Sequence, residues 1–219
     1  MPNWVYNNLS ITDPSGEHTD DIARLMEQVG ATYTIRAASY ASGTFEVRDV
    51  EVTNPGLSFW NIVRPEGEDS KEYAESIGAS GAMPFWYNWN CDNWGCKWDA
   101  SDVDIQDHAA DHKQITFSTP WSPPLPVLVT LSEQYPNLHI ELEWEEEQGF
   151  GGTFVFTNGE ATETDSYDIP NSHADHVARD RTCVCEWDDD AENFYPDCPG
   201  YIPDENKIAE DELEVEAML

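Results

Sequence analysis

The sequence predicts an α+β protein with a split βαβ core, and three features of the chain support this prediction. Strand-like and helix-like segments follow the order β-α-β-β-α-β once a Trp-rich segment is set aside. Asn158-Gly159 between two β-type runs predicts a further hairpin after them. From His173 onward the hydrophobic periodicity is lost. We therefore expect a ferredoxin-like domain at residues 1–170 with an insertion at about 44–96, and an acidic extension containing Cys and His at 171–219.

The first half of the chain supplies the first strand and the first helix of this core. Residues 3–12, "NWVYNNLSIT", are typical of a strand and are followed by the turn residues "DPSG". Residues 17–31 predict a helix, because their apolar residues have helical spacing: Ile22, Leu25, Met26 and Val29. Residues 43–52 predict a short strand, and residues 54–77 predict an extended stretch, a loop and a short polar helix.

The second half completes the order of elements. Residues 96–106 and 113–121 predict two strands joined through "DHAADH". Residues 125–137 predict a helix that begins next to prolines, and residues 138–147 alternate apolar and acidic side chains as a strand with one wet face does. The glycine-rich "GFGG" that follows predicts a turn or a bulge, and its acidic surroundings make it unsuited to hold a phosphate.

The charge of the chain limits its partners. Its 219 residues contain 44 Asp and Glu against 10 Lys and Arg, which gives a net charge of −34. Such a surface repels nucleic acids and anionic membranes and attracts basic surfaces. We therefore expect no direct binding to nucleic acid or membrane. Two explanations of the acidity stay open, namely solvation in high salt and a patch shaped for a basic partner.

The compartment follows from what the sequence lacks. The first residues have neither a basic region nor an apolar region of a secretory signal, and no segment has the length of apolar residues that a membrane helix needs. The 5 cysteines are an odd number, which argues against a complete disulfide framework. We expect a cytoplasmic protein with reduced thiols.

Several motifs occur in the order of a known family. They are "MPNWVYNNLSIT", "LSFWNIVRPEGE", "FWYNWNCDNWGCKWDAS", "ITFSTPWSPPLPV" and "EWEEEQGFGGTFVFTNGE". Together they resemble the Api92-like/YubB-like family of bacteriophages and conjugative plasmids over residues 1–170. The resemblance is most specific at Asn93-Trp94-Gly95 with Lys97-Trp98-Asp99, and at Trp121-Ser122-Pro123-Pro124. It implies a ferredoxin-like fold and a mobile-element setting, and it implies no activity. The family commonly has Thr where this chain has Cys96.

The Trp-rich stretch at residues 85–102 has two interpretations. In the arrangement that the resemblance implies, it is an architectural corner in which Trp94 and Trp98 are buried and Gly95 allows close approach of the backbone. Alternatively, it forms an aromatic groove for a small ligand or a peptide, with Trp86, Trp89 and Trp121 partly exposed. The candidate residues of this groove are Trp86, Trp89, Trp94, Trp98 and Trp121.

Metal sites and catalytic motifs give weaker signals. Five residues of the extension could hold a structural zinc ion, the alternative being free thiols in a packed tail: His173, His176, Cys183, Cys185 and Cys198. Cys91 and Cys96 could share a disulfide or a metal, or remain two buried thiols. His108 and His112 have the i, i+4 spacing of a helical metal pair, but they fall in an expected hairpin connection, so we expect them to face solvent. No cofactor is implied by any motif, and no nucleophile, P-loop or dinucleotide motif occurs.

We therefore expect an accessory binding protein more than an enzyme. The favoured hypothesis is an acidic mimic of nucleic acid, encoded by a phage or mobile element, that occupies the basic surface of a host nucleic-acid-processing or defence factor. Its partner-binding residues would be Glu141, Glu143, Glu145, Glu146, Glu147, Asp188, Asp189 and Asp190. The alternatives are a salt-adapted protein with a ligand or peptide in the Trp-rich groove, and an enzyme that uses a Trp-lined cleft.

Overall fold

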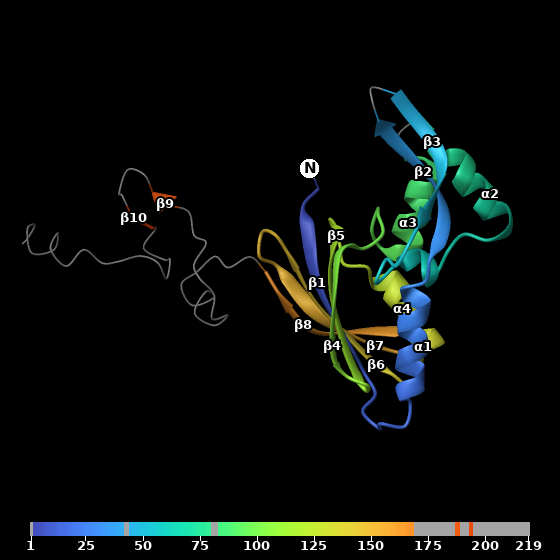
Figure 1. Ribbon diagram of the computed structural model, residues 1–219. Helices are drawn as coiled ribbons and strands as arrows, with labels where there is room; N and C mark the ends of the chain where they lie inside the picture. The colour runs from blue at the N-terminus through green and yellow to red at the C-terminus, as the bar shows by residue number, and fades with distance from the viewer. Residues whose placement is uncertain (1, 42–43, 80–82, 169–186, 189–192, 195–219) are drawn as a thin grey trace, which may run out of the picture. The chain divides into compact units, whose positions relative to one another are not determined.

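The computed structural model describes residues 2–41, 44–79, 83–168, 187–188 and 193–194 (Figure 1). The chain divides into two units, Met1–Asp168 and Ile169–Leu219. The first unit contains all the helices and the main sheet of the described residues. In the second unit, β9 (Trp187–Asp188) pairs in antiparallel fashion with β10 (Asn193–Phe194).

A six-stranded antiparallel sheet forms the first unit, in the order β4-β5-β1-β6-β7-β8. Its ferredoxin-like part consists of β1 (Trp4–Thr12), α1 (Thr19–Val29), β4 (Ser101–Ala109), β5 (His112–Pro120), α4 (Leu125–Gln134) and β6 (His139–Glu146). These elements follow the predicted β-α-β-β-α-β order, and β1 lies in the middle, where it pairs with both β5 and β6. The predicted α+β class with a ferredoxin-like domain is therefore confirmed.

A hairpin extends this sheet beyond β6. The strands β7 (Gly151–Thr157) and β8 (Glu160–Tyr167) are joined by Asn158 and Gly159, which have positive φ angles of 47° and 85°. A two-residue turn with both φ angles positive is the type I′ turn that Asn-Gly favours, so the predicted hairpin is confirmed. The predicted turn at "GFGG" is also present, since the Gly149 N–H donates to the Glu146 carbonyl at 2.7 Å.

One face of the sheet carries the hydrophobic core. The helices α1 and α4 lie together on this face (Figure 1), and Ile22, Leu25 and Leu128 are fully buried there. Alternate residues of the strands point toward them, because side chains of a strand alternate between the two faces. The buried strand residues include Val5, Leu9, Ile11, Ile115, Phe117, Ile140, Leu142 and Phe156. No helix of the described residues packs on the other face.

A group of smaller elements separates α1 from β4. They are β2 (Tyr33–Ala41), β3 (Thr44–Val52), the short 3-10 helix η1 (Phe59–Asn61), α2 (Gly67–Ser76) and α3 (Phe85–Trp94). β2 and β3 form a two-stranded hairpin of their own, next to α2 and α3 in Figure 1. This group begins at Tyr33, earlier than the expected boundary at residue 44, because β2 pairs with β3 along its whole length.

Gly95 ends α3 and lies against the start of α4. Its φ angle of 86° is in the left-handed region, and an added Cβ atom would lie 2.6 Å from Cδ of Pro126. Both conditions require glycine, because other residues resist this φ and any side chain would overlap Pro126. The predicted close approach of the backbone at Gly95 is confirmed.

No helix among the described residues is long and apolar enough to cross a membrane. The five residues of the predicted zinc site, His173, His176, Cys183, Cys185 and Cys198, lie outside the described residues. No cluster of His, Cys, Asp and Glu within the described part of the chain could hold a metal ion.

Candidate functional site

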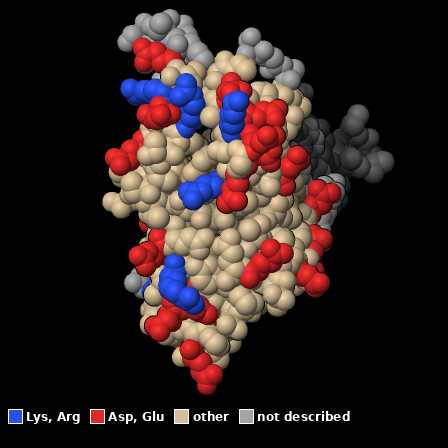
Figure 2. All heavy atoms as spheres, turned by 90° about the vertical axis from the view of Figure 1, so that its right-hand side faces the viewer, with Lys and Arg blue, Asp and Glu red and all other residues tan. Residues whose placement is uncertain are grey.

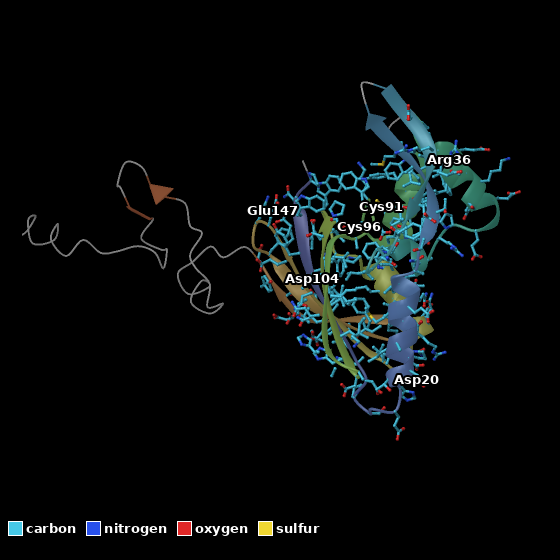
Figure 3. The ribbon with its side chains drawn as sticks, viewed as in Figure 1. Asp20, Arg36, Cys91, Cys96, Asp104 and Glu147 are labelled. Atoms are coloured by element: carbon cyan, nitrogen blue, oxygen red, sulfur yellow. The ribbon has the colours of Figure 1, made fainter. Side chains whose placement is uncertain are left out.

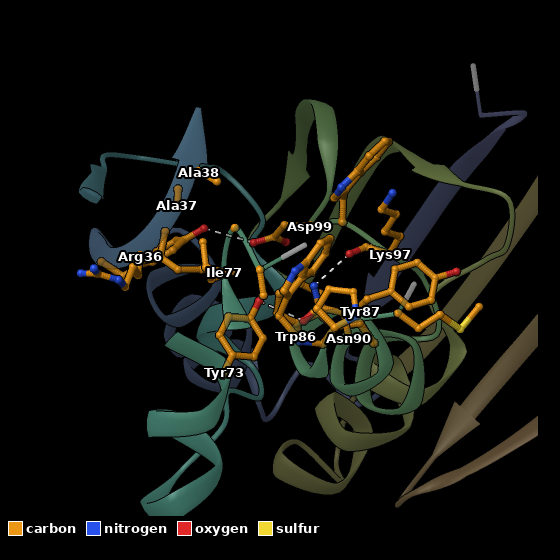
Figure 4. Close-up of a pocket in the computed structure, with 18 residues that line it drawn as sticks. Arg36, Ala37, Ala38, Tyr73, Ile77, Trp86, Tyr87, Asn90, Lys97 and Asp99 are labelled. Carbon is orange, nitrogen blue, oxygen red and sulfur yellow. Dashed lines mark hydrogen bonds between the residues drawn. The ribbon is translucent and has the colours of Figure 1, made fainter. Parts of the chain in front are cut away.

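A pocket of about 850 Å³ lies between β2, the end of α2, α3 and the segment Gly95–Asp99 (Figure 4). Its walls are mainly aromatic and apolar. Four consecutive residues of β2 line it, from Ile35 to Ala38, so this strand faces the pocket with its edge. The other lining residues are Tyr33, Tyr73, Ile77, Gly78, Ala79, Met83, Pro84, Trp86, Tyr87, Asn90, Trp94, Lys97, Trp98 and Asp99.

Hydrogen bonds fix the segment Gly95–Asp99 at one wall of this pocket. Ser122 donates its hydroxyl to the Gly95 carbonyl at 2.6 Å. The Asn90 amide donates to the Lys97 carbonyl at 2.8 Å, and the Cys96 thiol donates to the Trp98 carbonyl at 3.2 Å. Side-chain donors thus bind three carbonyls of this segment. The backbone that carries the side chains of Lys97 and Trp98 is therefore held in place.

Asp99 is a half-buried residue whose carboxylate lies at the pocket. Its Oδ1 accepts from the backbone N–H groups of Phe59 at 2.6 Å and Ala100 at 2.8 Å. Its Oδ2 accepts from the hydroxyls of Ser58 at 2.5 Å and Tyr33 at 3.1 Å. Burial raises the pKa of Asp99, and the hydrogen bonds from Ser58 and Phe59 oppose this shift. With four donors, both carboxylate oxygens are fully occupied by the protein itself.

Aromatic side chains of α3 and their partners support the pocket. Trp94 is buried, and its indole N–H donates to the Val63 carbonyl at 3.0 Å. Its ring makes an edge contact with Trp89, with the centroids 5.9 Å apart. The Tyr73 hydroxyl donates to Asn90 at 3.0 Å, and burial raises the pKa of Tyr73 to about 12. The same Asn90 holds Lys97, so this buried polar pair connects α2 to the pocket wall.

Four aromatic rings surround the ammonium group of Lys97. Its Nζ lies 4.6 Å from the ring centre of Trp98 and 5.5 Å from that of Trp121. The rings of Tyr87 and Trp86 are 5.6 Å and 6.0 Å away. A cation within about 6 Å of an aromatic face is attracted by the ring, so we call Trp86, Tyr87, Trp98 and Trp121 the aromatic cage. Three of its four rings also line the pocket.

The structure corrects two predictions about the tryptophans. Trp98 was expected to be buried and is 41% exposed, because its ring packs at the surface against Trp121. Trp89 was expected to be partly exposed and is buried with 9% exposure, because α3 turns it toward Tyr73 and Trp94. Trp94 is buried and Trp121 is 48% exposed, as predicted.

Only part of the predicted groove therefore belongs to the pocket. Trp86, Trp94 and Trp98 line it, whereas Trp89 and Trp121 do not. Sequence reasoning did not assign a role to Lys97 or Asp99, although both are in the most specific motif of the family resemblance. The signal that could have found Lys97 is its place as a basic residue inside an aromatic run of a strongly acidic chain.

Cys91 in α3 and Cys96 just after this helix are free thiols (Figure 3), and no disulfide joins them. Cys96 is buried, and this burial raises its pKa well above the ordinary range. Cys91 is half-buried, and burial raises its pKa as well. Of the possibilities for this pair, the structure shows free thiols, with only Cys96 fully buried.

A second candidate site is the sheet face opposite α1 and α4. The strand registers align its outward residues in three rows across all six strands. The first row is Asp104, Thr116, Asn8, Glu143, Thr153 and Asp165. The second is Gln106, Gln114, Ser10, Glu141, Val155 and Thr162, and the third is Ser101, Ser118, Tyr6, Glu145, Gly151 and Tyr167. We call these rows the acidic sheet face, because they contain acids on three strands and no Lys or Arg.

Hydrogen bonds orient the acids of this face. Gln114 donates to Asn8 at 2.7 Å, and Asn8 in turn donates to Glu143 at 3.0 Å. The Tyr167 hydroxyl donates to Glu145 at 2.9 Å. On the face of α1 and the β2–β3 hairpin, by contrast, Lys and Arg lie among the acids (Figure 2).

The predicted acidic patch is partly present on this face. Glu141, Glu143 and Glu145 point outward together, as alternation along β6 predicts. Glu146 was expected in the patch, but it is buried with 2% exposure, because the chain turns after β6 and its carboxylate accepts from the Gln148 N–H at 2.6 Å. Glu147 is exposed beyond the end of β6. Asp189 and Asp190 lie outside the described residues, and only the backbone of Asp188 is described.

The two histidines also have a described place. His108 is exposed near the end of β4, and His112 begins β5 and is half-buried. Their rings stack with the centroids 4.9 Å apart. They belong to the strands β4 and β5 and not to the connection between them, where they were expected, and of the two only His108 faces solvent as expected.

Comparison with known proteins agrees with this architecture. Residues 93–186 match the model of a family described as the ferredoxin-like domain in Api92-like protein. The sheet thus belongs to a protein with a ferredoxin-like domain, and β1 and α1 precede the matched residues.

The crystal structure of the protein Api92 from Yersinia pseudotuberculosis is similar in fold, with a TM-score of 0.50 and 12% sequence identity. The similarity covers 78% of this chain and 99% of that one. At this identity, the likeness concerns the fold alone. A comparison with curated proteins found no match.

Proposed function

We propose that this protein binds a small, flat, largely apolar molecule in the pocket between β2 and α3. The observation that carries this proposal is the pocket itself, with a volume of about 850 Å³ and predominantly aromatic and aliphatic walls. Ligand pockets are typically about 300–1,000 Å³ with mainly apolar walls and a few placed polar groups. The placed polar groups here are Asn90, Lys97 and Asp99.

The wall on the side of α3 is organised before any ligand binds. Hydrogen bonds hold three carbonyls between Gly95 and Trp98, and Asp99 joins this segment to η1 and β2. A rigid wall loses little conformational entropy on binding, which favours a ligand over a collapsed surface. Aromatic rings such as Trp86 and Trp98 offer flat faces on which a planar molecule stacks.

A bulky substitution on β2 that fills the pocket tests this proposal. Ala37 lines the pocket (Figure 4), so an Ala37→Trp substitution fills it without removing a hydrogen bond of its side chain. Thr34 is exposed on the same strand and does not line the pocket, so Thr34→Trp is the matched control. The probe is naphthalenemethanol, titrated by calorimetry.

We expect the unchanged protein and Thr34→Trp to bind this probe saturably, with a dissociation constant of about 1 mM or below, as its size allows. Ala37→Trp should not bind it. Absence of saturable binding to the unchanged protein, or equal binding by Ala37→Trp, would show that the pocket is not a ligand site.

A second function is favoured by the acidic sheet face. We propose that this face binds a basic protein surface that otherwise binds nucleic acid. The carboxylates of the face would take the place of the nucleic-acid phosphates on that surface. Five outward acids, Asp104, Glu141, Glu143, Glu145 and Asp165, lie in three rows that contain no Lys or Arg. The phage or plasmid setting and a host factor as partner belong to this proposal.

Substitutions that remove carboxylate charges separate the effect of this face from the effect of the net charge of the molecule. We would replace Glu141, Glu143 and Glu145 by Gln and measure binding to a lysine-rich peptide at several salt concentrations. The control replaces Glu17, Asp20 and Glu27, which are exposed at or near α1, by their amides, so that the net charge changes equally.

The sheet-face variant should bind the peptide more weakly than the control and lose less affinity as salt rises, because fewer paired charges are screened. An equal loss in both variants would assign the attraction to net charge alone, and this second proposal would be withdrawn.

A further inference from the structure

Lys97 is placed in the pocket in a way that a structural role does not explain. Its ammonium lies among the four rings of the aromatic cage, and it has no ion pair among the residues that the structure describes. What distinguishes Lys97 is that the four rings hold its ammonium group beside the pocket.

We infer that the pocket is specific for a small molecule that has an apolar, planar body and one carboxylate group, which the ammonium of Lys97 binds. This inference rests on the proposed ligand function and adds the chemical class of the ligand. The planar body lies between β2 and α3, and the carboxylate points toward the cage.

The other charged groups of the pocket are already engaged with the protein, so Lys97 is the charged donor available to a ligand. Both oxygens of Asp99 already accept two hydrogen bonds each from the protein, so Asp99 offers no acceptor to a cationic ligand. Arg36 lies on the opposite side of the pocket in Figure 4 and contacts Asp49 at 3.3 Å. An ammonium has three N–H donors and needs no acceptor of its own, so Lys97 can bind a carboxylate while it remains next to the rings.

The cage also favours an anion over a cation. The negative faces of Trp86, Tyr87, Trp98 and Trp121 already interact with Lys97, so a cationic ligand would have to displace it from all four rings. An anion leaves these contacts intact. Because Asn90 fixes the Lys97 backbone and the rings restrict its side chain, a carboxylate meets a donor whose conformational entropy is already reduced.

Three probes with one ring system and different charges test this inference in the full-length protein. They are naphthoate, naphthalenemethanol and naphthalenemethylammonium, each titrated by calorimetry at neutral pH. The variant is Lys97→Gln. The control is Lys71→Gln, which changes the net charge equally on α2, where Lys71 contacts Glu75 and does not line this pocket. A Lys97→Arg variant keeps the charge.

We expect naphthoate to bind about ten-fold more tightly than naphthalenemethanol, the size of a hydrogen bond to a charged group, and the ammonium probe to bind most weakly. In Lys97→Gln the preference for naphthoate should disappear while the affinity for naphthalenemethanol is kept within about two-fold. Lys71→Gln and Lys97→Arg should keep the preference.

Three results would overturn the inference. They are equal binding of naphthoate and naphthalenemethanol by the unchanged protein, a preference for naphthoate that survives in Lys97→Gln, and tightest binding of the ammonium probe. As long as naphthalenemethanol binds saturably in these experiments, the proposed pocket function stands. If naphthalenemethanol does not bind, the proposed function fails as well, which distinguishes the two failures.

Discussion

The Ser58 hydroxyl donates to the Asp99 carboxylate at 2.5 Å and so ties the residue before η1 to the segment that leads into β4. Tyr33 in β2 donates to the same carboxylate oxygen. One carboxylate therefore connects β2, η1 and the start of β4, three segments that are far apart in sequence. The shape of the pocket floor depends on this junction, which leads to the first prediction.

Asp99→Ala should lower the free energy of unfolding by about 2–4 kcal/mol, because it leaves the N–H groups of the buried Phe59 and the half-buried Ala100 without an acceptor. Asp99→Asn should lose about 1 kcal/mol or less. Its amide oxygen can accept from the two N–H groups, and its NH₂ group can donate to the two hydroxyls once they rotate. Urea unfolding measures both variants. Equal losses would show that the charge of Asp99 matters, and not the count of its acceptors.

Gly95→Ala should destabilise the protein more than Gly67→Ala. Both glycines have positive φ, 86° and 58°, which alone costs an alanine about 1–2 kcal/mol. An added Cβ at Gly67 meets nothing within 4 Å, whereas at Gly95 it would lie 2.6 Å from Pro126, so overpacking adds about 1–3 kcal/mol there. The urea midpoints of the two variants give the comparison. Equal midpoints would mean that α4 can shift at Pro126 to accept the added Cβ atom without a further loss of stability.

Tyr73→Phe tests the buried pair of Tyr73 and Asn90 through pH. At neutral pH the variant should be less stable by about 1–3 kcal/mol, because the Asn90 oxygen loses its donor. Above pH 10, unfolded Tyr73 loses its proton while the native residue keeps it up to about pH 12. The native state then binds more protons than the unfolded state, so the stability of the unchanged protein falls as pH rises.

This fall amounts to about 2–3 kcal/mol over the two pH units. The Phe variant lacks it, so the stability difference between the two proteins should shrink between pH 10 and 12. Urea unfolding at pH 7, 10 and 12 measures the difference. A constant difference across this range would contradict burial as the cause of the raised pKa.

The two described cysteines should differ in reactivity. In a protein whose Cys183, Cys185 and Cys198 are replaced by Ser, iodoacetamide at pH 8 should modify Cys91 slowly and leave Cys96 unmodified. Burial raises the pKa of both thiols, so little thiolate is present, and Cys96 is also closed to the reagent. Mass spectrometry of peptides reports each site, and labelling in urea shows full reactivity. Rapid native labelling of Cys96 would contradict its burial.

The regular elements of the core could be predicted because their hydrophobic periods are clear. β1, α1 and β6 each place apolar residues at the spacing of their secondary structure, and the Asn158-Gly159 pair defines the β7–β8 turn. β2 was not predicted, because it pairs only with β3 in a separate hairpin and has little alternation in "YTIRAASYA". α3 was not predicted as a helix, since its aromatic and Asn residues form helices weakly and show no single apolar face.

The region of the candidate site could be predicted from the sequence, but the placement of its individual side chains could not. Density of tryptophan identifies the region, yet the burial of each ring depends on partners distant in the chain, such as Tyr73 for Trp89. Alternation predicts that Glu141, Glu143 and Glu145 share a face, whereas Glu146 follows the local turn to Gln148. Lys97 and Asp99 acquire their roles from Asn90 and Ser58, contacts that no local pattern shows.

The central place of β1 in the sheet has a consequence for biosynthesis. Every ladder partner of β1 belongs to β5 or β6, from His112 to Glu146, so this strand leaves the ribosome long before either neighbour exists. At roughly 5–20 residues per second, the wait until both neighbours have been translated lasts on the order of ten seconds. During this time both edges of an apolar nascent strand lack partners, and the sheet assembles only after translation has passed β6. We therefore expect the expression yield to depend on chaperones that keep this segment from other chains until then.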